Sequence, residues 1–152
     1  MQFVSDEIAK KIDKRFKISG SDLLIAMTGA EVGKVGLVPI TDKELWLNQR
    51  VGLFKEKIKY ANWFCYLTLS TDEFQNILLS SASGSAQPNI SSTQIESTET
   101  LIPSIELIER FGETVNPMFE KMLENLSQNQ TLTQLRDNLL PQLMTGKIEV
   151  NA

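Results

Sequence analysis

The sequence has 152 residues, of which 41% are apolar and 22% charged, with a formal net charge of −4 at pH 7. These values are ordinary for one soluble domain with an extension. The absence of histidine excludes a histidine-dependent triad, and the single cysteine, Cys65, excludes an internal disulfide and suits a reducing cytoplasm. No apolar run approaches the roughly 20 residues of a membrane span, so we expect a cytoplasmic protein without a signal peptide.

Charge is distributed unevenly along the chain. Residues 1–60 hold eleven Lys/Arg and eight Asp/Glu, a net charge of +3, whereas residues 61–152 hold four and eleven, a net charge of −7. The overall charge argues against a nonspecific polyanion binder. The distribution nevertheless allows a basic face on the N-terminal part, with an acidic helix kept away from it.

The chain begins with a predicted helix. Residues 5–15, SDEIAKKIDKR, have Ser5 as a plausible N-cap, acidic residues in the first turn and basic residues at the end, which matches the helix dipole. The basic cluster is either a solvated helix end or a phosphate contact.

A hairpin is predicted next. After a turn at 20–22, the apolar run 23–28 predicts a buried strand, and a second strand follows the segment TGAEVGK. The tip of the hairpin then carries Thr28, Glu31 and Lys34. The segment is not a P-loop, because no Lys-Ser/Thr pair follows its second glycine and a strand rather than a helix comes next.

Residues 44–54 predict two strands separated by the polar residues Asn48, Gln49 and Arg50. Side-chain amides beside an arginine are suited to reading base edges, because Asn and Gln bind adenine and Arg binds guanine. The alternative is a turn whose amides satisfy backbone groups.

The next segment, 62–70, is ambiguous: its β-propensity favours a strand, whereas its length and the helical pattern after it permit a buried helix. Residues 70–82 predict a helix with a capping box of Ser70 and Glu73. The loop 83–93 is rich in small polar residues and is either a plain linker or a functional loop, and its density of hydrogen-bonding groups favours function.

The last third predicts one long amphipathic helix from 104 to about 140, roughly 55 Å long. The radius of gyration of such a domain is only about 15 Å, so the helix must project. Its apolar stripe needs a partner, and a second such helix is the simplest one. We expect Pro117 to kink the helix, Asn125 and Asn129 to fix the register of the seam, and Pro141 and Gly146 to end the helix. The stripe has a first part and a second part beyond a polar stretch: Ile108, Phe111, Val115, Met118 and Met122, then Leu132, Leu135, Leu139 and Leu143.

Four segments resemble one family, the specificity subunits of type I restriction–modification enzymes. DLLIAMTGAEVGKVGLV (22–38), LNQRVGLF (47–54) and GSAQPNIS (84–91) are similar to the signatures of its recognition domain. NQTLTQLRDNLLPQLMTGKIEV (129–150) resembles the closing part of its conserved helical region. The resemblance covers nearly the whole chain in the correct order.

The resemblance implies a non-catalytic, DNA-reading protein without a cofactor or metal. A full subunit has two target-recognition domains, each reading half of a bipartite DNA target, and two long helices that pack antiparallel as a ruler. It recruits methyltransferase subunits, which the restriction/translocase subunit joins. This chain would supply one partial recognition domain (1–103), without the part normally upstream of FVSDEIAKK, and one helix (104–152). The resemblance also favours a helix at 62–70.

We therefore expect an α+β fold: a small, mostly antiparallel sheet with short helices, followed by a long projecting helix of the coiled-coil type. We expect a homodimer through the seam from Ile108 to Met122. The alternative is a coiled-coil oligomerisation module without independent DNA binding. The candidate DNA-binding residues are Thr28, Lys34, Arg50, Ser85, Gln87 and Asn89. The candidates for docking a methyltransferase subunit are Leu132, Leu135, Arg136, Leu139 and Leu143.

Overall fold

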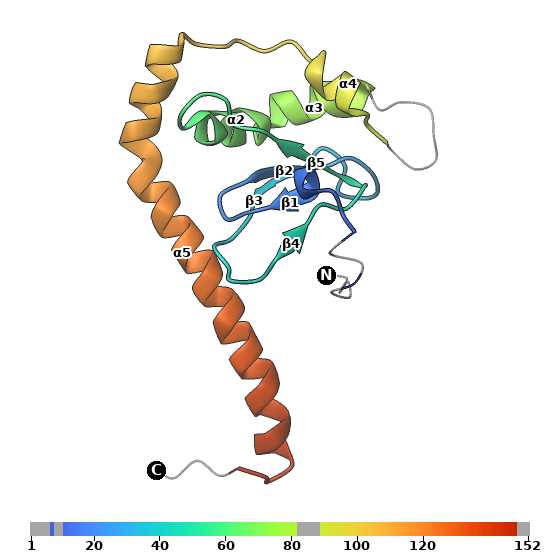
Figure 1. The fold of residues 1–152 in the computed structure, drawn as a ribbon, viewed down its shortest axis with the longest axis vertical. Helices are drawn as coiled ribbons and strands as arrows, with labels where there is room; N and C mark the ends of the chain where they lie inside the picture. The colour runs from blue at the N-terminus through green and yellow to red at the C-terminus, as the bar shows by residue number, and fades with distance from the viewer. Residues whose placement is uncertain (1–6, 8–10, 82–88, 149–152) are drawn as a thin grey trace.

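The structure, a computed structural model, describes residues 7, 11–81 and 89–148. A globular part carries the strands and short helices, and one long helix runs along its side and beyond it (Figure 1). The expected α+β class is confirmed. The elements in chain order are η1 (Lys14–Phe16), β1 (Lys17–Ile18), β2 (Leu23–Ala26), β3 (Val35–Leu37), β4 (Leu45–Trp46), β5 (Val51–Phe54), α2 (Ala61–Leu69), α3 (Asp72–Ser81), α4 (Ser92–Glu96) and α5 (Ile105–Met144).

The strands form two small antiparallel sheets. β2 lies between β3 and β5 in a three-stranded sheet, with Leu24 opposite Gly36 on one side and Leu53 on the other, and β1 pairs with β4. Side chains of β2 alternate, so Leu23 and Ile25 are fully buried. α2 and α3 cover this face of the sheet. The resulting core contains Leu23, Ile25, Val32, Leu69, Phe74, Leu78 and Ile90.

The helix predicted at 5–15 is wrong over its described end. Residues 11–13 are not helical, and a short 3-10 helix follows at Lys14–Phe16. The carboxylate of Asp13 accepts a hydrogen bond from the backbone N–H of Arg15 at 2.9 Å, which starts a new turn and leads the chain into β1. Glu7 is helical, but its neighbours lie outside the described residues.

The ambiguous segment 62–70 forms α2, as the resemblance implies. Packing outweighs β-propensity in this segment, because the helix buries Trp63 against α5 and Leu69 against the sheet. The half-buried Cys65 packs against the sheet core. Burial is the main cause that raises the pKa of its thiol, and the nearby carboxylate of Glu56 raises this pKa further.

The capping box predicted for α3 is wrong. The Ser70 hydroxyl donates backward to the Tyr66 carbonyl at 2.6 Å and therefore finishes α2. The next residue, Thr71, caps α3 instead, because its hydroxyl oxygen accepts from the Phe74 N–H at 3.3 Å.

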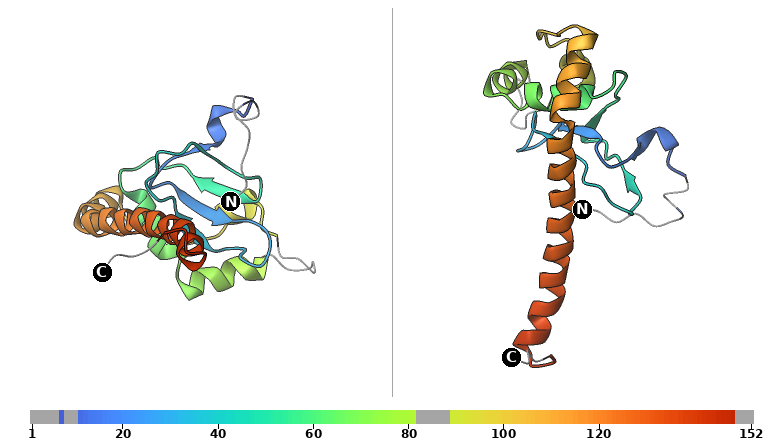
Figure 2. Two further views of the ribbon diagram at one scale, coloured as in Figure 1. Left: turned by 90° about the horizontal axis from the view of Figure 1, so that it is seen from below. Right: turned by 90° about the vertical axis from the view of Figure 1, so that its left-hand side faces the viewer.

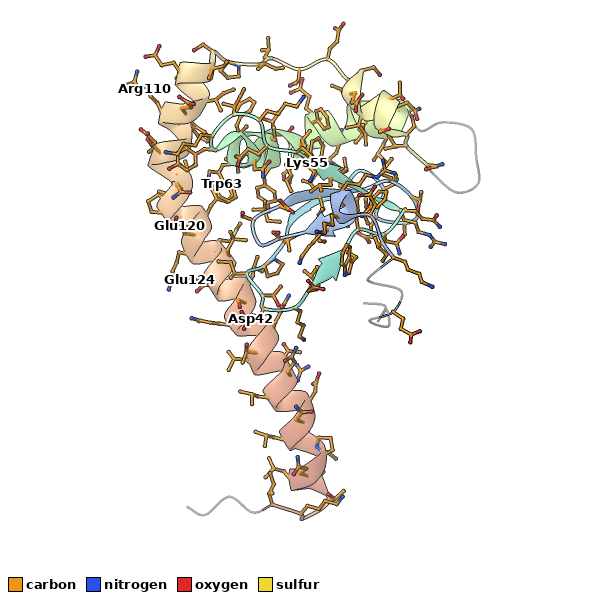
Figure 3. All side chains as sticks on the ribbon, viewed as in Figure 1. Asp42, Lys55, Trp63, Arg110, Glu120 and Glu124 are labelled. Carbon is orange, nitrogen blue, oxygen red and sulfur yellow. The ribbon has the colours of Figure 1, made fainter. Side chains whose placement is uncertain are left out.

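α5 is one continuous helix of 40 residues. The Ser104 hydroxyl oxygen accepts from the Leu107 N–H at 3.3 Å and caps its start. The helix axis changes direction between Arg110 and Glu124, the region of Pro117 (Figure 3). Pro141 lies inside the helix and does not end it. The end is a glycine cap, since Gly146 has a φ of 67° and its N–H donates to the Leu143 carbonyl at 3.1 Å.

The first half of α5 packs against its own domain. Trp63 of α2 stacks on Phe119 with ring centroids 4.5 Å apart, and its indole N–H donates to the Asn116 side-chain oxygen at 3.1 Å. Ile108, Gly112, Phe119 and Leu123 are buried here. This half of the stripe therefore has a partner within the chain, α2, but α2 has 9 residues against 40 in α5, and Met118 remains 69% exposed.

The second half of α5 projects. Every residue from 128 to 147 is exposed, and the right-hand view of Figure 2 shows this part of the helix continuing past the sheet. Among the described helices, none is long and apolar enough to cross a membrane.

Candidate nucleic-acid interface

One end of the three-stranded sheet collects most of the described candidate residues. Thr28 follows β2, whereas Lys34 and Arg50 directly precede β3 and β5. Because β2 is antiparallel to both neighbours, its end lies beside their beginnings. The backbone confirms this: the Ala26 N–H donates to the Lys34 carbonyl at 2.9 Å, and the Met27 N–H donates to the Arg50 carbonyl at 2.8 Å.

Asn89 reaches the same end from a distant part of the chain. It forms an isolated antiparallel bridge with Thr28, and the Ile90 N–H donates to the Met27 carbonyl at 2.9 Å. Ile90 is fully buried and anchors this segment. Thr28, Lys34, Arg50 and Asn89 thus lie together, and we call this set the sheet-end cluster. Ser85 and Gln87 lie outside the described residues.

The polar groups of the cluster are available to solvent. Lys34 and Glu31 form an ion pair at 2.5 Å with both side chains about two-thirds exposed. Such a pair contributes at most about 1 kcal/mol, so the ammonium can exchange Glu31 for a stronger anion such as a phosphate. Arg50 is also exposed. The side-chain oxygen of Asn48 accepts a hydrogen bond from the Arg50 N–H at 3.0 Å. The Asn48 amide therefore satisfies a backbone group of the turn, which is the alternative to a base-reading role that the sequence left open.

Two glycines shape the loop that carries Glu31 and Lys34. Gly29 and Gly33 have φ values of 91° and 85°, a region that side chains with a Cβ rarely adopt. The Gly33 N–H donates back to the Ala26 carbonyl at 2.8 Å, and Val32 turns inward and is buried. The loop is therefore closed on itself, with its charged residues outside and one apolar anchor inside.

Gln75 of α3 holds this loop from behind, a feature that sequence reasoning missed. Its amide N–H groups donate to the Gly33 carbonyl and to the Leu69 carbonyl, both at 2.7 Å. One side chain therefore ties the loop to the end of α2. Gln75 lies in the helix 42 positions from Gly33, and no local pattern marks such a bond.

A short helix after Asn89 was also missed, although the sequence carried a signal for it. Ser91 and Gln94 form a capping box, with the Ser91 hydroxyl oxygen accepting from the Gln94 N–H at 3.2 Å and the Ser91 N–H donating to the Gln94 side-chain oxygen at 2.9 Å. The spacing of a serine and a glutamine three residues apart is the usual signature. Among the described residues, no three His, Cys, Asp or Glu side chains are placed to hold a metal ion.

The chain belongs to the family described as the type I restriction modification DNA specificity domain, which it matches over residues 3–134. The resemblance inferred from the sequence is thereby confirmed.

Two curated relatives are similar to this chain. The type I restriction enzyme HindI specificity subunit of Haemophilus influenzae is 35% identical over 118 residues, which are 77% of this chain and 26% of that subunit. The type I restriction enzyme MjaIX specificity subunit of Methanocaldococcus jannaschii is 26% identical over 148 residues, which are 95% of this chain and 33% of that subunit. The aligned region thus covers 26% and 33% of the length of these relatives.

Proposed function

We propose that this chain recognises a specific DNA sequence as the specificity component, or half of it, of a type I restriction–modification system. Family membership supports DNA recognition in general. The observation that supports a particular surface is the sheet-end cluster, where cationic and amide side chains from four separate segments lie at one exposed end of the sheet.

The chemistry of the cluster suits both parts of DNA binding. Lys34, a flexible ammonium on a closed loop, would contact a phosphate and position the domain. Arg50 can donate two hydrogen bonds to guanine, and Asn89 and Gln87 have the amide geometry that matches adenine. Thr28 and Ser85 would support them with hydroxyl groups. The reading residues would then be Arg50 and the 84–91 segment, with Lys34 as the anchor.

The experiment that tests this function is selection of bound DNA from a random library, with and without a methyltransferase partner. Enrichment of one half-site sequence is the expected result, stronger with the partner. The surface is tested by repeating the selection with Arg50→Ala, which should change the enriched sequence. Unchanged enrichment would place the reading surface elsewhere.

The proposal also assigns partner subunits to α5. The leucines of its projecting half are exposed, with Leu135 49% and Leu139 45% accessible, and Arg136 forms an ion pair with Asp137 at 2.7 Å beside them. Exposed apolar residues rimmed by charge are typical of a protein interface. We propose that Leu132, Leu135, Arg136, Leu139 and Leu143 contact a methyltransferase subunit, which the restriction/translocase subunit joins. The chain itself would have no catalytic role.

A homodimer through α5 is part of the same proposal. The chain has one long helix whose outer face no described element covers, and a second copy supplies a matching helix. Ile108 is buried, and Val115 and Met122 pack against the cluster of Trp63, Phe119 and Leu123. The dimer seam would therefore use the remaining members, Phe111 and Met118.

The second candidate function is an oligomerisation module that does not bind DNA by itself. The formal net charge of −4 and the ion pair that already occupies Lys34 favour it. Library selection that enriches no sequence, combined with a stable dimer, would support this function instead.

A further inference from the structure

The segment that leads into β1 is strongly cationic. Residues 11–17 include four Lys or Arg and one Asp, a net charge of +3, and all four cations are exposed. η1, dark blue in the right-hand view of Figure 2, stands out from the globular part on the side away from α5. The segment therefore lies away from the glutamates in the first half of that helix, which would otherwise weaken its attraction for an anion.

The backbone places this segment beside the sheet-end cluster. β1 pairs with β4, with Lys17 opposite Trp46, and the Phe16 carbonyl accepts a hydrogen bond from the Leu47 N–H at 2.7 Å. Leu47 follows β4 directly and begins the turn that ends at Arg50, the arginine of the sheet-end cluster. η1 and the cluster are therefore attached to the two ends of one short turn, and a ligand that spans this turn reaches both.

Arg15 is held in an orientation that leaves part of its guanidinium group open. One carboxylate oxygen of Asp13 accepts the backbone N–H of Arg15 at 2.9 Å, and the other lies 3.3 Å from the Arg15 side-chain Nε. The guanidinium carbon lies 4.6 Å from the centroid of the Phe16 ring, an attractive cation–π contact. Among the described residues, none accepts a hydrogen bond from the two terminal nitrogens of Arg15. These nitrogens form an edge that can bind two oxygens of one phosphate.

The lysines of the segment differ in their partners. The Lys17 ammonium lies 2.6 Å from a carboxylate oxygen of Glu44, so its charge is neutralised within the protein. Lys14 has no ion-pair partner among the residues that the structure describes. Lys14 and Arg15 are therefore the two adjacent cations of η1 that can meet an external anion.

We propose that Lys14 and Arg15 form a binding site for the phosphate backbone of DNA, next to the turn that carries Arg50. This site deepens the proposed DNA recognition and rests on it. Arg15 would hold one phosphate through the open edge of its guanidinium group, and Lys14 would hold a neighbouring phosphate as a flexible point charge. With Lys34 as a further anchor, cations from two separate segments then fix the duplex against Arg50. The site assigns the phosphate contact, rather than a solvated helix end, to the described part of the N-terminal basic cluster.

Salt-dependent binding tests the two contacts. Lys14→Ala and Arg15→Ala should each weaken binding to preferred and random duplexes alike and lower the salt slope of log K by about one, and the double variant should lower it by about two. The loss is expected to be about eightfold per variant at roughly 0.1 M salt, because one contact with a slope near about 0.9 gains that factor relative to about 1 M salt. Lys43→Ala is the control. Lys43 is also exposed, but it lines the groove between the loop 39–45 and α5.

The sequence enriched by library selection should be the same for all three variants, because a phosphate contact carries no base preference. A changed sequence for Lys14→Ala or Arg15→Ala would overturn the phosphate assignment. Losses in Lys43→Ala equal to those in the two η1 variants would also overturn it, because they would reflect net charge alone. Circular dichroism checks that each variant is folded.

Asp13 gives a second test with the opposite sign. Its carboxylate is next to the site and repels phosphates. Asp13→Asn keeps a side-chain oxygen for the Arg15 N–H and removes the charge, so it should tighten binding to preferred and random duplexes alike. Asp42→Asn, which removes an exposed carboxylate from the loop 39–45, should leave the affinity unchanged. Weaker binding by Asp13→Asn would show that η1 does not meet the DNA backbone.

Neutral methylphosphonates locate the contact on the DNA. Each phosphate of the enriched duplex is replaced in turn, and the positions whose neutralisation weakens binding are recorded. One of these positions should lose its effect in Arg15→Ala, and a different one should lose its effect in Lys34→Ala. If every position keeps its effect in Arg15→Ala, this arginine has no phosphate partner.

Failure of this site and failure of DNA recognition give different results. Normal enrichment with an unchanged salt slope in both η1 variants would overturn the phosphate site and leave DNA recognition standing. Binding that depends on Lys14 and Arg15 without any enrichment would support the site and contradict base reading. A chain that binds no DNA, with or without a methyltransferase partner, would overturn both.

Discussion

Gln75 illustrates how a single side chain positions the candidate DNA-binding loop. The loop backbone near Gly33 is left-handed, and an alanine Cβ at this glycine would lie 3.1 Å from the Gln75 side-chain oxygen. Gln75 therefore fits against a loop that has no side chain at that point. Its two donated hydrogen bonds connect the loop and α2, so the position of Lys34 depends on a residue that has no DNA contact of its own in the proposed function.

Replacing Gln75 by leucine should destabilise the domain by about 1–3 kcal/mol, because two carbonyl groups lose their donors while the volume stays similar. Amide hydrogen exchange at Val32 and Lys34 should rise by more than the change in global stability explains. Asn76→Leu on the exposed side of the same helix is the control and should change neither quantity. Equal loop protection in both variants would mean that the hairpin holds the loop alone.

Lys34→Ala should weaken binding to all DNA sequences alike and reduce the salt slope of log K by about one. Lys121→Ala is a closely matched control. Lys121 forms an ion pair with Glu124 three residues away and is 64% exposed, against 68% for Lys34, but it lies on α5. Salt-dependent fluorescence anisotropy measures both. Equal losses for the two variants would reveal a general charge effect rather than a phosphate contact.

Gln87→Ala tests the reading segment, although Gln87 lies outside the described residues. If its amide reads a base edge, the preferred site should lose about 1–3 kcal/mol of binding free energy while random DNA is unaffected. Competition binding with preferred and random duplexes separates these effects. A uniform loss on both would assign Gln87 to the backbone instead.

At the scale of elements, the contact between α2 and α5 fixes the globular part on the helix. Figure 3 shows Trp63 directed from α2 toward α5. The Asn116 side chain accepts the indole N–H and donates to a Glu120 carboxylate oxygen at 2.8 Å, so the contact is both stacked and hydrogen-bonded. Tyr60, with a φ of 64°, lies directly over Gly112, where an added Cβ would be 2.1 Å from the Tyr60 Cβ. The two helices can approach this closely only because position 112 is glycine.

Gly112→Ala tests whether helix propensity or close packing decides the effect on stability, because the two predict changes of opposite sign. Helix propensity alone would stabilise the protein by about 1 kcal/mol. We expect the opposite, a destabilisation of about 1–3 kcal/mol, because the new methyl group forces α2 away from α5. Urea unfolding and the fluorescence of Trp63 report it. Gly36→Ala is the control, since an added Cβ there meets nothing within 4 Å.

At the scale of the whole molecule, the projecting half of α5 is free for other chains. A chain ending before Thr131 should remain folded by circular dichroism, because the leucines it loses are exposed, but it should no longer co-purify with a methyltransferase subunit. Unfolding would instead assign these leucines to the core.

Leu135→Glu separates docking from dimerisation, because Leu135 lies in the projecting half of α5, outside the proposed dimer seam from Ile108 to Met122. We expect this variant to lose the methyltransferase subunit and to keep its sedimentation behaviour, whereas Gln134→Glu should keep both. A variant that still co-purifies would move the docking surface away from Leu135. Loss of the dimer would mean that the dimer seam extends into the projecting half of α5.

The sequence by itself determined the features that depend on near neighbours. These include the apolar strand β2, the long period of α5 and the glycine at its end, because each follows from residues within one or two turns. Short sequence motifs also identified the family. Only the tertiary structure decided the helical state of α2 and the use of Phe119 and Leu123 against Trp63, since both depend on burial by a partner far along the chain. The sheet-end cluster likewise depends on contacts between segments that are far apart in the sequence. Asn89 meets Thr28 through a backbone bridge across 61 positions, and no local pattern encodes a pairing at that distance.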